Sequence, residues 1–104
     1  MACNCCNCRF VKAESIAATT TTITITVPTD TDLTSVGCMR IGLFTSIPTS
    51  VSCANVVVTN GTESLNILKN DGDYWRPCKL ACRSILRTRV LDDPSHLLIE
   101  GVSR

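Results

Sequence analysis

The sequence predicts an all-β protein: a single β-sandwich or jelly roll of about seven or eight strands, with an extended N-terminal arm. Three observations support this class. Short segments alternate apolar and polar residues with the two-residue period of a half-buried strand. Turn-forming residues recur about every ten residues. The chain has 104 residues, 44% of them apolar and 18% charged, which is a globular composition of a length that suits one domain.

The body of the domain is expected to span residues 19–104. Its first strand is the segment TTTTITITVP, in which Ile23, Ile25 and Val27 alternate with threonine. A two-residue period built from β-branched side chains is typical of a half-buried strand. Pro28 ends this strand, and a turn-rich connection follows.

Three further strand signals follow along the chain. The segment GCMRIGLFT alternates Met39, Ile41 and Leu43 with the residues of the opposite face. The apolar run SVSCANVVVT ends at Asn60 and Gly61, a dipeptide that strongly favours a hairpin turn. The segment ESLNILK comes next and ends at a second turn, NDGD.

The last part of the body contains a long alternating segment, residues 80–90. The residues expected to point inward are Leu80, Cys82, Leu86 and Val90. The residues expected to line the outer face are Arg83, Ile85, Arg87 and Arg89. An amphipathic helix is the alternative for this segment, because its apolar residues partly satisfy a 3.6-residue period. The segment SHLLIEGV closes the chain as a last strand.

Residues 1–18 are expected to form an arm in front of this body, because they show no sustained period of either kind. The arm opens with MACNCCNC, which holds four of the eight cysteines: Cys3, Cys5, Cys6 and Cys8. The body carries the other four: Cys38, Cys53, Cys78 and Cys82. An extended arm of this length spans on the order of 60 Å, so it reaches its own domain or a neighbouring copy.

Three uses of these sulfur atoms stay open at this point: disulfides to another copy, disulfides within the chain, and metal binding by thiolates. Cys5 and Cys6 are adjacent, and a bridge between them would strain the peptide unit. Structural zinc sites use wider C-x₂₋₄-C spacings, so no resident metal or other cofactor is expected. Eight cysteines allow about 105 pairings, and the sequence does not choose among them.

Charge and composition argue against several classes of function. A net charge of +1 and the lack of an aromatic platform argue against a nucleic-acid partner. No apolar run approaches the roughly 18 residues that a membrane-spanning helix needs. Five basic residues form a strip that is expected to be a solvated face or a subunit contact: Arg76, Lys79, Arg83, Arg87 and Arg89.

The remaining motifs have ordinary structural explanations. Asn60 begins a formal glycosylation sequon, but the same residues favour a turn. The residues around Gly72 resemble a calcium loop without its full spacing, and a hairpin turn explains them better. His96 is the single histidine, and no nucleophile, base and oxyanion site assembles around it. The chain is therefore not expected to be an enzyme.

Two observations bear on the expected location, and they point to different compartments. No secretory signal peptide is legible, yet eight cysteines in 104 residues are typical of an oxidised extracellular protein. One resolution is synthesis in a reducing cytosol followed by release when the cell lyses. The other is a cytosolic metal-thiolate protein.

The arm and body together resemble the endospore appendage (Ena) subunits of spore-forming bacteria, which are jelly-roll proteins with a cysteine-bearing N-terminal connector. The matching residues are the adjacent pair Cys5 and Cys6, followed by Cys8, ahead of an all-β body. The resemblance implies that the connector inserts into a neighbouring subunit and forms intermolecular disulfides, giving a fibre. It also implies assembly in a mother cell that later lyses, and hence a location at the spore surface.

We therefore expect a structural protein whose partner is itself, a homopolymer forming a disulfide-cross-linked extracellular filament such as a spore appendage. The arm cysteines are the expected donors of the links, and the body cysteines are the expected acceptors. Strand edges would add docking by β-augmentation. The alternatives are a cysteine-thiolate metal-binding module and a spore-coat or virion surface lattice protein.

Overall fold

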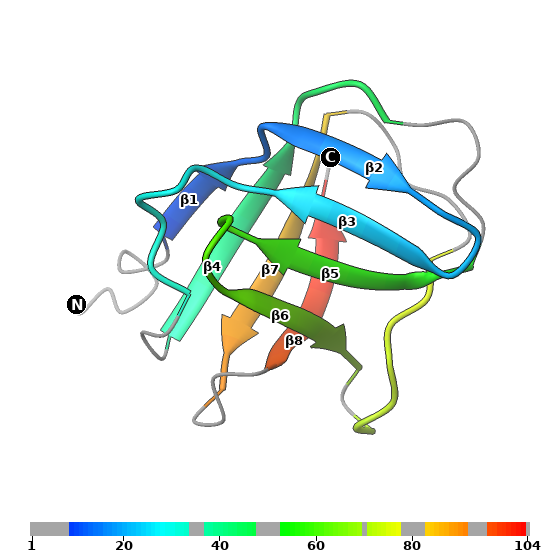
Figure 1. Ribbon diagram of the computed structural model, residues 1–104. Coiled ribbons are helices and arrows are strands. Elements are labelled where there is room, and N and C mark those ends of the chain that lie inside the picture. Colours follow the sequence, from blue (N-terminus) through cyan, green and yellow to red (C-terminus); the bar gives the residue numbers. More distant parts are fainter. Residues whose placement is uncertain are drawn as a thin grey trace.

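Eight strands form one sheet that curls round on itself in the computed structural model of the chain (Figure 1). The structure describes residues 9–33, 37–47, 53–69, 71–77, 83–91 and 96–103. The strands within these ranges are β1 Arg9–Lys12, β2 Ser15–Ala18, β3 Thr22–Thr26, β4 Gly37–Leu43, β5 Asn55–Thr59, β6 Ser64–Leu68, β7 Ser84–Val90 and β8 His96–Ser103. The described ranges hold no helix, and the all-β prediction is confirmed. In particular, the C-terminal part of the 80–90 segment is the strand β7.

The order of strands in the sheet is β1-β4-β7-β8-β6-β5-β3-β2. Three of the neighbouring pairs are parallel, namely β1–β4, β3–β5 and β6–β8, and the others are antiparallel. A jelly roll is built from antiparallel strands in two sheets. The finer expectation of a jelly-roll sandwich is therefore not confirmed: the strands make a single curled sheet with mixed pairing.

The first two strands join the two ends of this sheet. β1 pairs with β4 and β2 pairs with β3, and only Ala13 and Glu14 separate them along the chain. At this junction the Ala13 N–H donates to Gly42 O (2.9 Å) and the Glu14 N–H donates to Thr26 O (2.7 Å). Residues 9–18, which the sequence led us to expect in the arm, thus belong to the sheet. Buried Ala13 and Ile16 tie this segment to the core.

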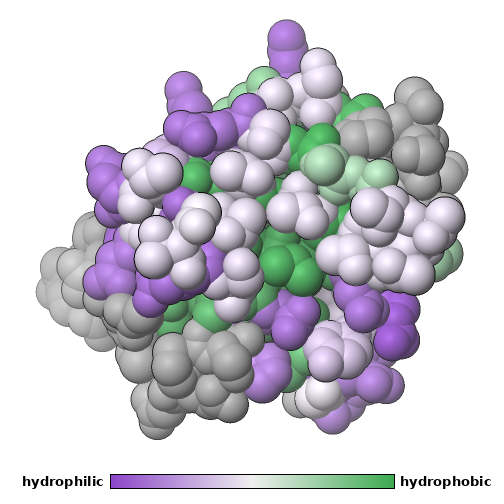
Figure 2. All heavy atoms as spheres, viewed as in Figure 1, coloured by the Kyte–Doolittle hydropathy of each residue, from purple (hydrophilic) through white to green (hydrophobic). Residues whose placement is uncertain are grey.

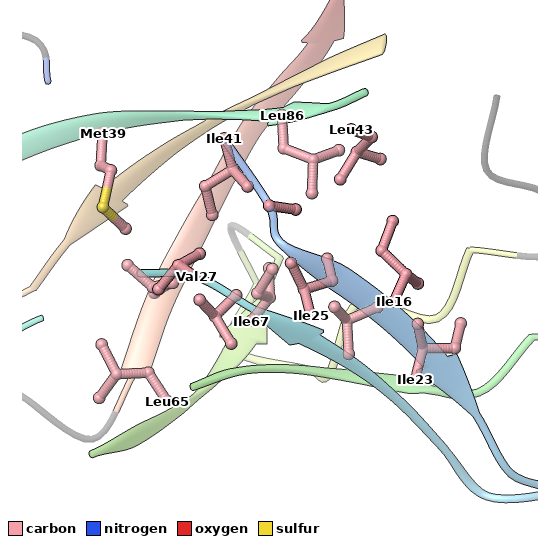
Figure 3. Close-up of a cluster of buried hydrophobic side chains, with 14 of the residues drawn as sticks. Ile16, Ile23, Ile25, Val27, Met39, Ile41, Leu43, Leu65, Ile67 and Leu86 are labelled. Atoms are coloured by element: carbon pink, nitrogen blue, oxygen red, sulfur yellow. The ribbon is translucent and has the colours of Figure 1, made fainter. Parts of the chain in front are cut away.

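The core lies between the two layers that the curled sheet forms, with β2, β3, β5 and β6 in front and β1, β4, β7 and β8 behind (Figure 1). Figure 3 shows Ile41 and Leu86 from the rear layer facing Ile25 and Ile67 from the front layer. All four side chains are fully buried. The inward residues predicted for the described strands are confirmed, each with no exposed surface: Ile23, Ile25, Val27, Met39, Ile41, Leu43, Leu86 and Val90. Leu80 and Cys82 lie outside the described residues.

The turn between β5 and β6 is fixed by the side chain of Asn60. Its Oδ1 accepts the N–H groups of Thr62 (2.9 Å) and Glu63 (2.7 Å), and its Nδ2 donates to Thr31 O (2.7 Å). Gly61 follows with a φ of 93°, a conformation that favours glycine. Asn60 is only 4% exposed, so this amide is part of the fold and is not presented to solvent for glycosylation.

Candidate functional site

Two of the cysteines, Cys38 and Cys53, lie in the described part of the chain, and both are disulfide-bonded. Cys38 is half-buried on β4, and its side chain is on the outer face because its neighbour Met39 points into the core. Cys53 is exposed just before β5 and has a φ of 44°. The other six lie outside the described residues: Cys3, Cys5, Cys6, Cys8, Cys78 and Cys82. The structure therefore says nothing of the role predicted for those six.

The outer face of β1, β4 and β7 gathers basic and aromatic side chains from three distant parts of the sequence. Register places Phe10 of β1 beside Arg40 of β4, and Arg40 beside Arg87 of β7. The same face holds Lys12, which is paired with Gly42, and Arg89, which is paired with Cys38. We call this surface the basic-aromatic face; it consists of Phe10, Lys12, Arg40, Gly42, Phe44, Arg87 and Arg89. Its four cations and two phenylalanines are all exposed.

The two phenylalanines fold over Gly42. Their ring centroids are 6.1 Å apart with an interplanar angle of 40°, an ordinary tilted aromatic contact. Phe10 is 49% exposed and Phe44 is 44% exposed. A Cβ on Gly42 would lie 2.6 Å from Phe44 Cε2 and 2.8 Å from Phe10 Cζ. The absence of a side chain at residue 42 therefore lets both rings lie against the sheet and form an apolar patch on its outside.

Arg87 lies across β8 in a similar way. A Cβ on Gly101, its register partner, would collide with the Arg87 guanidinium. A register shift between Arg87 and Thr88 accompanies this pairing. The next outward arginine, Arg89, donates through Nε to Glu100 Oε2 at 3.1 Å. The arginines of β7 are thus laid flat along the sheet surface, and Arg89 has a carboxylate partner.

The five basic residues predicted to form one strip do not all lie on the same face of the structure. Arg87 and Arg89 do share an outer face, as predicted. Arg76 instead lies over the Tyr74 ring, 5.7 Å from its centroid, and donates to Asn55 at the start of β5. Arg83 is exposed in the turn just before β7, where its N–H donates to Leu43 O (2.8 Å). Lys79 lies outside the described residues.

Two members of the basic-aromatic face, Phe10 and Lys12, were not predicted from the sequence. The segment RFVK forms only four residues of strand, too short to show a clear period. Its parallel pairing with β4 spans a long stretch of chain and leaves no hairpin signal. Arg40, by contrast, alternates with Met39 and Ile41, which predicts its outward position.

A hollow of about 410 Å³ lies at the other side of β8. It is lined by Lys69, Asp71, Trp75, Ile99, Glu100, Gly101 and Val102. Here the pairing of β6 with β8 ends at Leu68 and Leu98, whereas β7 remains paired with β8 as far as Ser103. The end of β8 beside the hollow is therefore paired, among the described strands, on its β7 side only.

The turn beside this hollow is a tight turn, as the sequence predicted. The Asp73 N–H donates to Asp71 Oδ1 (3.0 Å), and the Lys69 N–H donates to Asp73 O (2.8 Å). The hydrogen bond from Asp73, with the Lys69 ammonium 3.7 Å away, lowers the pKa of the Asp71 carboxyl. Gly72 occupies the positive-φ position of this turn. The carboxylate of Asp71 is thus engaged in local turn contacts.

Within the described ranges, no three potential ligands among His, Cys, Asp and Glu lie close enough together to hold a metal ion. His96 begins β8, where its register partner is Asn66. No membrane-spanning helix is found among the described residues. The comparisons with known proteins gave no relative: no family model, no curated protein and no solved structure matches this chain.

Proposed function

We propose that this protein is a structural subunit that self-assembles into a disulfide-cross-linked extracellular filament. The observation that carries the proposal is the place of the cysteine segment, residues 1–8, which joins directly onto β1 at Arg9. β1 is a terminal strand of the sheet order and borders the basic-aromatic face. We expect the four cysteines of this segment to link to a neighbouring copy.

The oxidised state of two body cysteines supports disulfide chemistry over metal-thiolate chemistry. Cys38 and Cys53 are already in disulfide bonds. A thiolate from a neighbouring copy would link to either one by exchange: it attacks one sulfur, a new S–S bond forms, and the old partner leaves as a thiolate. The number of disulfides is unchanged, so this step needs no external oxidant. Exposed Cys53 is the more accessible of the two acceptors.

The sheet supplies a second, non-covalent means of assembly. The end of β8, from Ile99 to Ser103, is paired on one side by β7 and borders the hollow on the other. Such an edge accepts an additional strand through main-chain hydrogen bonds. Half-exposed Val102 and the partly buried Trp75 would give that strand an apolar contact. This edge supports docking by β-augmentation.

The proposal extends to location through the cysteine chemistry. A disulfide-linked polymer persists in an oxidising environment, and release by lysis of the producing cell would place it there. A spore-surface fibre of this kind is the setting that the resemblance of the cysteine segment implies. The metal-thiolate and lattice alternatives make different predictions in the same experiment.

The test compares the full chain with two variants on non-reducing and reducing denaturing gels, with electron microscopy of each sample. Cys5→Ser/Cys6→Ser removes sulfur from the segment, and Asn4→Ser/Asn7→Ser changes the same segment without removing sulfur. We expect the parent and the asparagine variant to form filaments and a reductant-sensitive ladder, and the cysteine variant to form neither. A parent that runs as a monomer under both conditions overturns the proposal. Stoichiometric bound zinc or copper would favour the metal-binding module instead.

A further inference from the structure

The basic-aromatic face contains a pair of like charges that local energetics disfavours. Arg40 and Arg87 are register partners on neighbouring antiparallel strands. Side chains in such positions have Cβ atoms roughly 4.5–5.5 Å apart, and like charges directly opposite each other are destabilising. Within the described residues, neither guanidinium makes an ion pair or hydrogen bond, whereas Arg89 next to them pairs with Glu100. Arg40 and Arg87 are therefore two exposed cations that acidic groups of a partner can meet on this face, with the Arg87 guanidinium lying over Gly101 of β8.

The surroundings of this pair are suited to a protein surface. The exposed Phe10 and Phe44 rings lie beside Arg40, so an incoming group would meet apolar area and charge together. Interfaces between proteins are enriched in aromatic residues and arginine, which commonly supply most of the binding energy. Planar guanidinium groups also match carboxylates in a two-point geometry. The chemistry of the face therefore fits a partner that presents carboxylates on a folded surface.

The chain itself offers such a surface at the end of the sheet where β3 and β5 finish. Asp30 and Asp32 lie on the loop after β3, and Glu63 lies on the turn before β6. Asn60 ties the two together, since its Nδ2 lies 2.7 Å from Thr31 O and 3.4 Å from Glu63 Oε1. We call these three carboxylates the acidic end, beside which one cation lies, since the Arg9 guanidinium donates to Asp32 O. Asp30 and Asp32 are exposed and Glu63 is half-buried.

We infer that the basic-aromatic face docks the acidic end of a second copy of this chain. The whole chain carries ten cationic and nine acidic residues, so its charge is nearly balanced. Copies with a net charge near +1 repel one another only weakly. Because the two surfaces are different parts of one subunit, the contact is heterologous and repeats from copy to copy. This inference rests on the proposed function and names the non-covalent contact within it.

The same contact would place Cys38 at the interface between two copies. Disulfide-bonded Cys38 lies on the basic-aromatic face beside Arg89. A copy docked here would have its loops next to Cys38. Charge docking would then set the orientation, and disulfide exchange would make it permanent.

The test uses the full chain with its existing disulfides intact and its free thiols capped with iodoacetamide, so that no covalent link forms between copies. Sedimentation velocity is measured at about 0.02 M and about 0.5 M salt, because screening separates charge docking from apolar association. We expect association at low salt that weakens at high salt. Arg40→Glu/Arg87→Glu should weaken it at least about tenfold, because it places like charges across the contact. The control Arg76→Glu changes an exposed cation that lies over Tyr74, outside both the face and the hollow, and should leave association unchanged.

A charge exchange identifies the partner surface. Copies carrying Arg40→Glu/Arg87→Glu are mixed with copies carrying Asp30→Lys/Glu63→Lys. Neither variant should associate alone, and the mixture should, with circular dichroism showing that each is folded. Association that survives the arginine variant, or that mixing does not restore, overturns the inference.

A chain that stays monomeric at both salts but is retained on immobilised polyphosphate through Arg40 and Arg87 also overturns the inference, in favour of a polyanion as partner. The proposed fibre is judged separately, with uncapped protein. Capped copies that dock while uncapped copies form no disulfide-linked filament would keep this inference and reject the fibre.

Discussion

The two layers of the curled sheet have the same kind of inner face and opposite outer faces. Inside, β3 and β4 both present fully buried aliphatic side chains at every second position. Outside, the front layer carries half-buried threonines on β3. Figure 2 shows that weakly polar and polar residues cover much of this face. The rear layer carries arginines and exposed phenylalanines. One core therefore supports two surfaces of different chemistry.

The two outer faces also differ in what they expose to water. Threonines on an outer strand face favour the pleated conformation and add no net charge. On the rear face, exposed Phe10 and Phe44 leave apolar area in water, and the register partners Arg40 and Arg87 carry like charges. The contact between copies that we infer would cover these side chains.

The largest effect should come from the core that the layers share. Ile41→Ala in the rear layer and Ile25→Ala in the front layer each remove a fully buried side chain, and each should lower the free energy of unfolding by about 3 kcal/mol. Urea unfolding of the thiol-capped monomer measures both. Thr24→Ala on the outer face of β3 is the control and should cost less than about 1 kcal/mol. Very unequal costs at Ile25 and Ile41 would contradict a common core.

The second effect concerns the packing of the aromatic rings. Gly42→Ala introduces a Cβ within 3 Å of atoms of both Phe10 and Phe44, and should destabilise the fold by about 1–3 kcal/mol. The same change in a Phe10→Ala/Phe44→Ala background should cost clearly less, because the obstructing rings are gone. Equal costs in the two backgrounds would show that the rings do not pack over Gly42. Urea unfolding of the four proteins gives the coupling.

The third effect separates a buried threonine from the exposed ones. Thr88 is 1% exposed, and its Oγ1 donates to Met39 O at 2.7 Å. Thr88→Val keeps the shape of the side chain and removes this hydrogen bond, so it should lower the free energy of unfolding by about 1 kcal/mol. Thr24→Val should change stability by less than about 0.5 kcal/mol. Thermal unfolding distinguishes them, and equal effects would contradict the contrast between a buried and a half-buried hydroxyl.

The smallest effect tests the repulsion across the basic-aromatic face. Arg87→Ala should raise the stability of the capped monomer by a few tenths of a kcal/mol at low salt, since it removes the like charge opposite Arg40. Arg89→Ala should not, because it breaks the ion pair with Glu100. A double-mutant cycle of Arg40→Ala and Arg87→Ala measures the coupling. A favourable coupling between the two arginines would remove the electrostatic reason for an anion at this site.

The sequence could predict those parts of the fold that depend on local pattern. Ile23, Ile25 and Val27 alternate with threonine and are buried, and Asn60 with Gly61 forms the turn that the dipeptide favours. What it could not give is the pairing of strands far apart in the chain. β1 joins β4 in parallel without a hairpin, and only this register brings Phe10 beside Arg40. The basic-aromatic face thus depended on non-local pairing, while its β7 arginines were visible from alternation alone.

The central claim is that cysteines of the N-terminal segment link one copy to another. The most direct measurement is disulfide mapping by mass spectrometry on filaments assembled from an equal mixture of ¹⁴N- and ¹⁵N-labelled protein. We expect disulfide-linked peptide pairs of mixed isotope composition, joining residues 3–8 of one copy to a body cysteine such as Cys53 of another. If every linked pair that contains the segment carries a single isotope, the links lie within one chain, and the cross-linked polymer is contradicted.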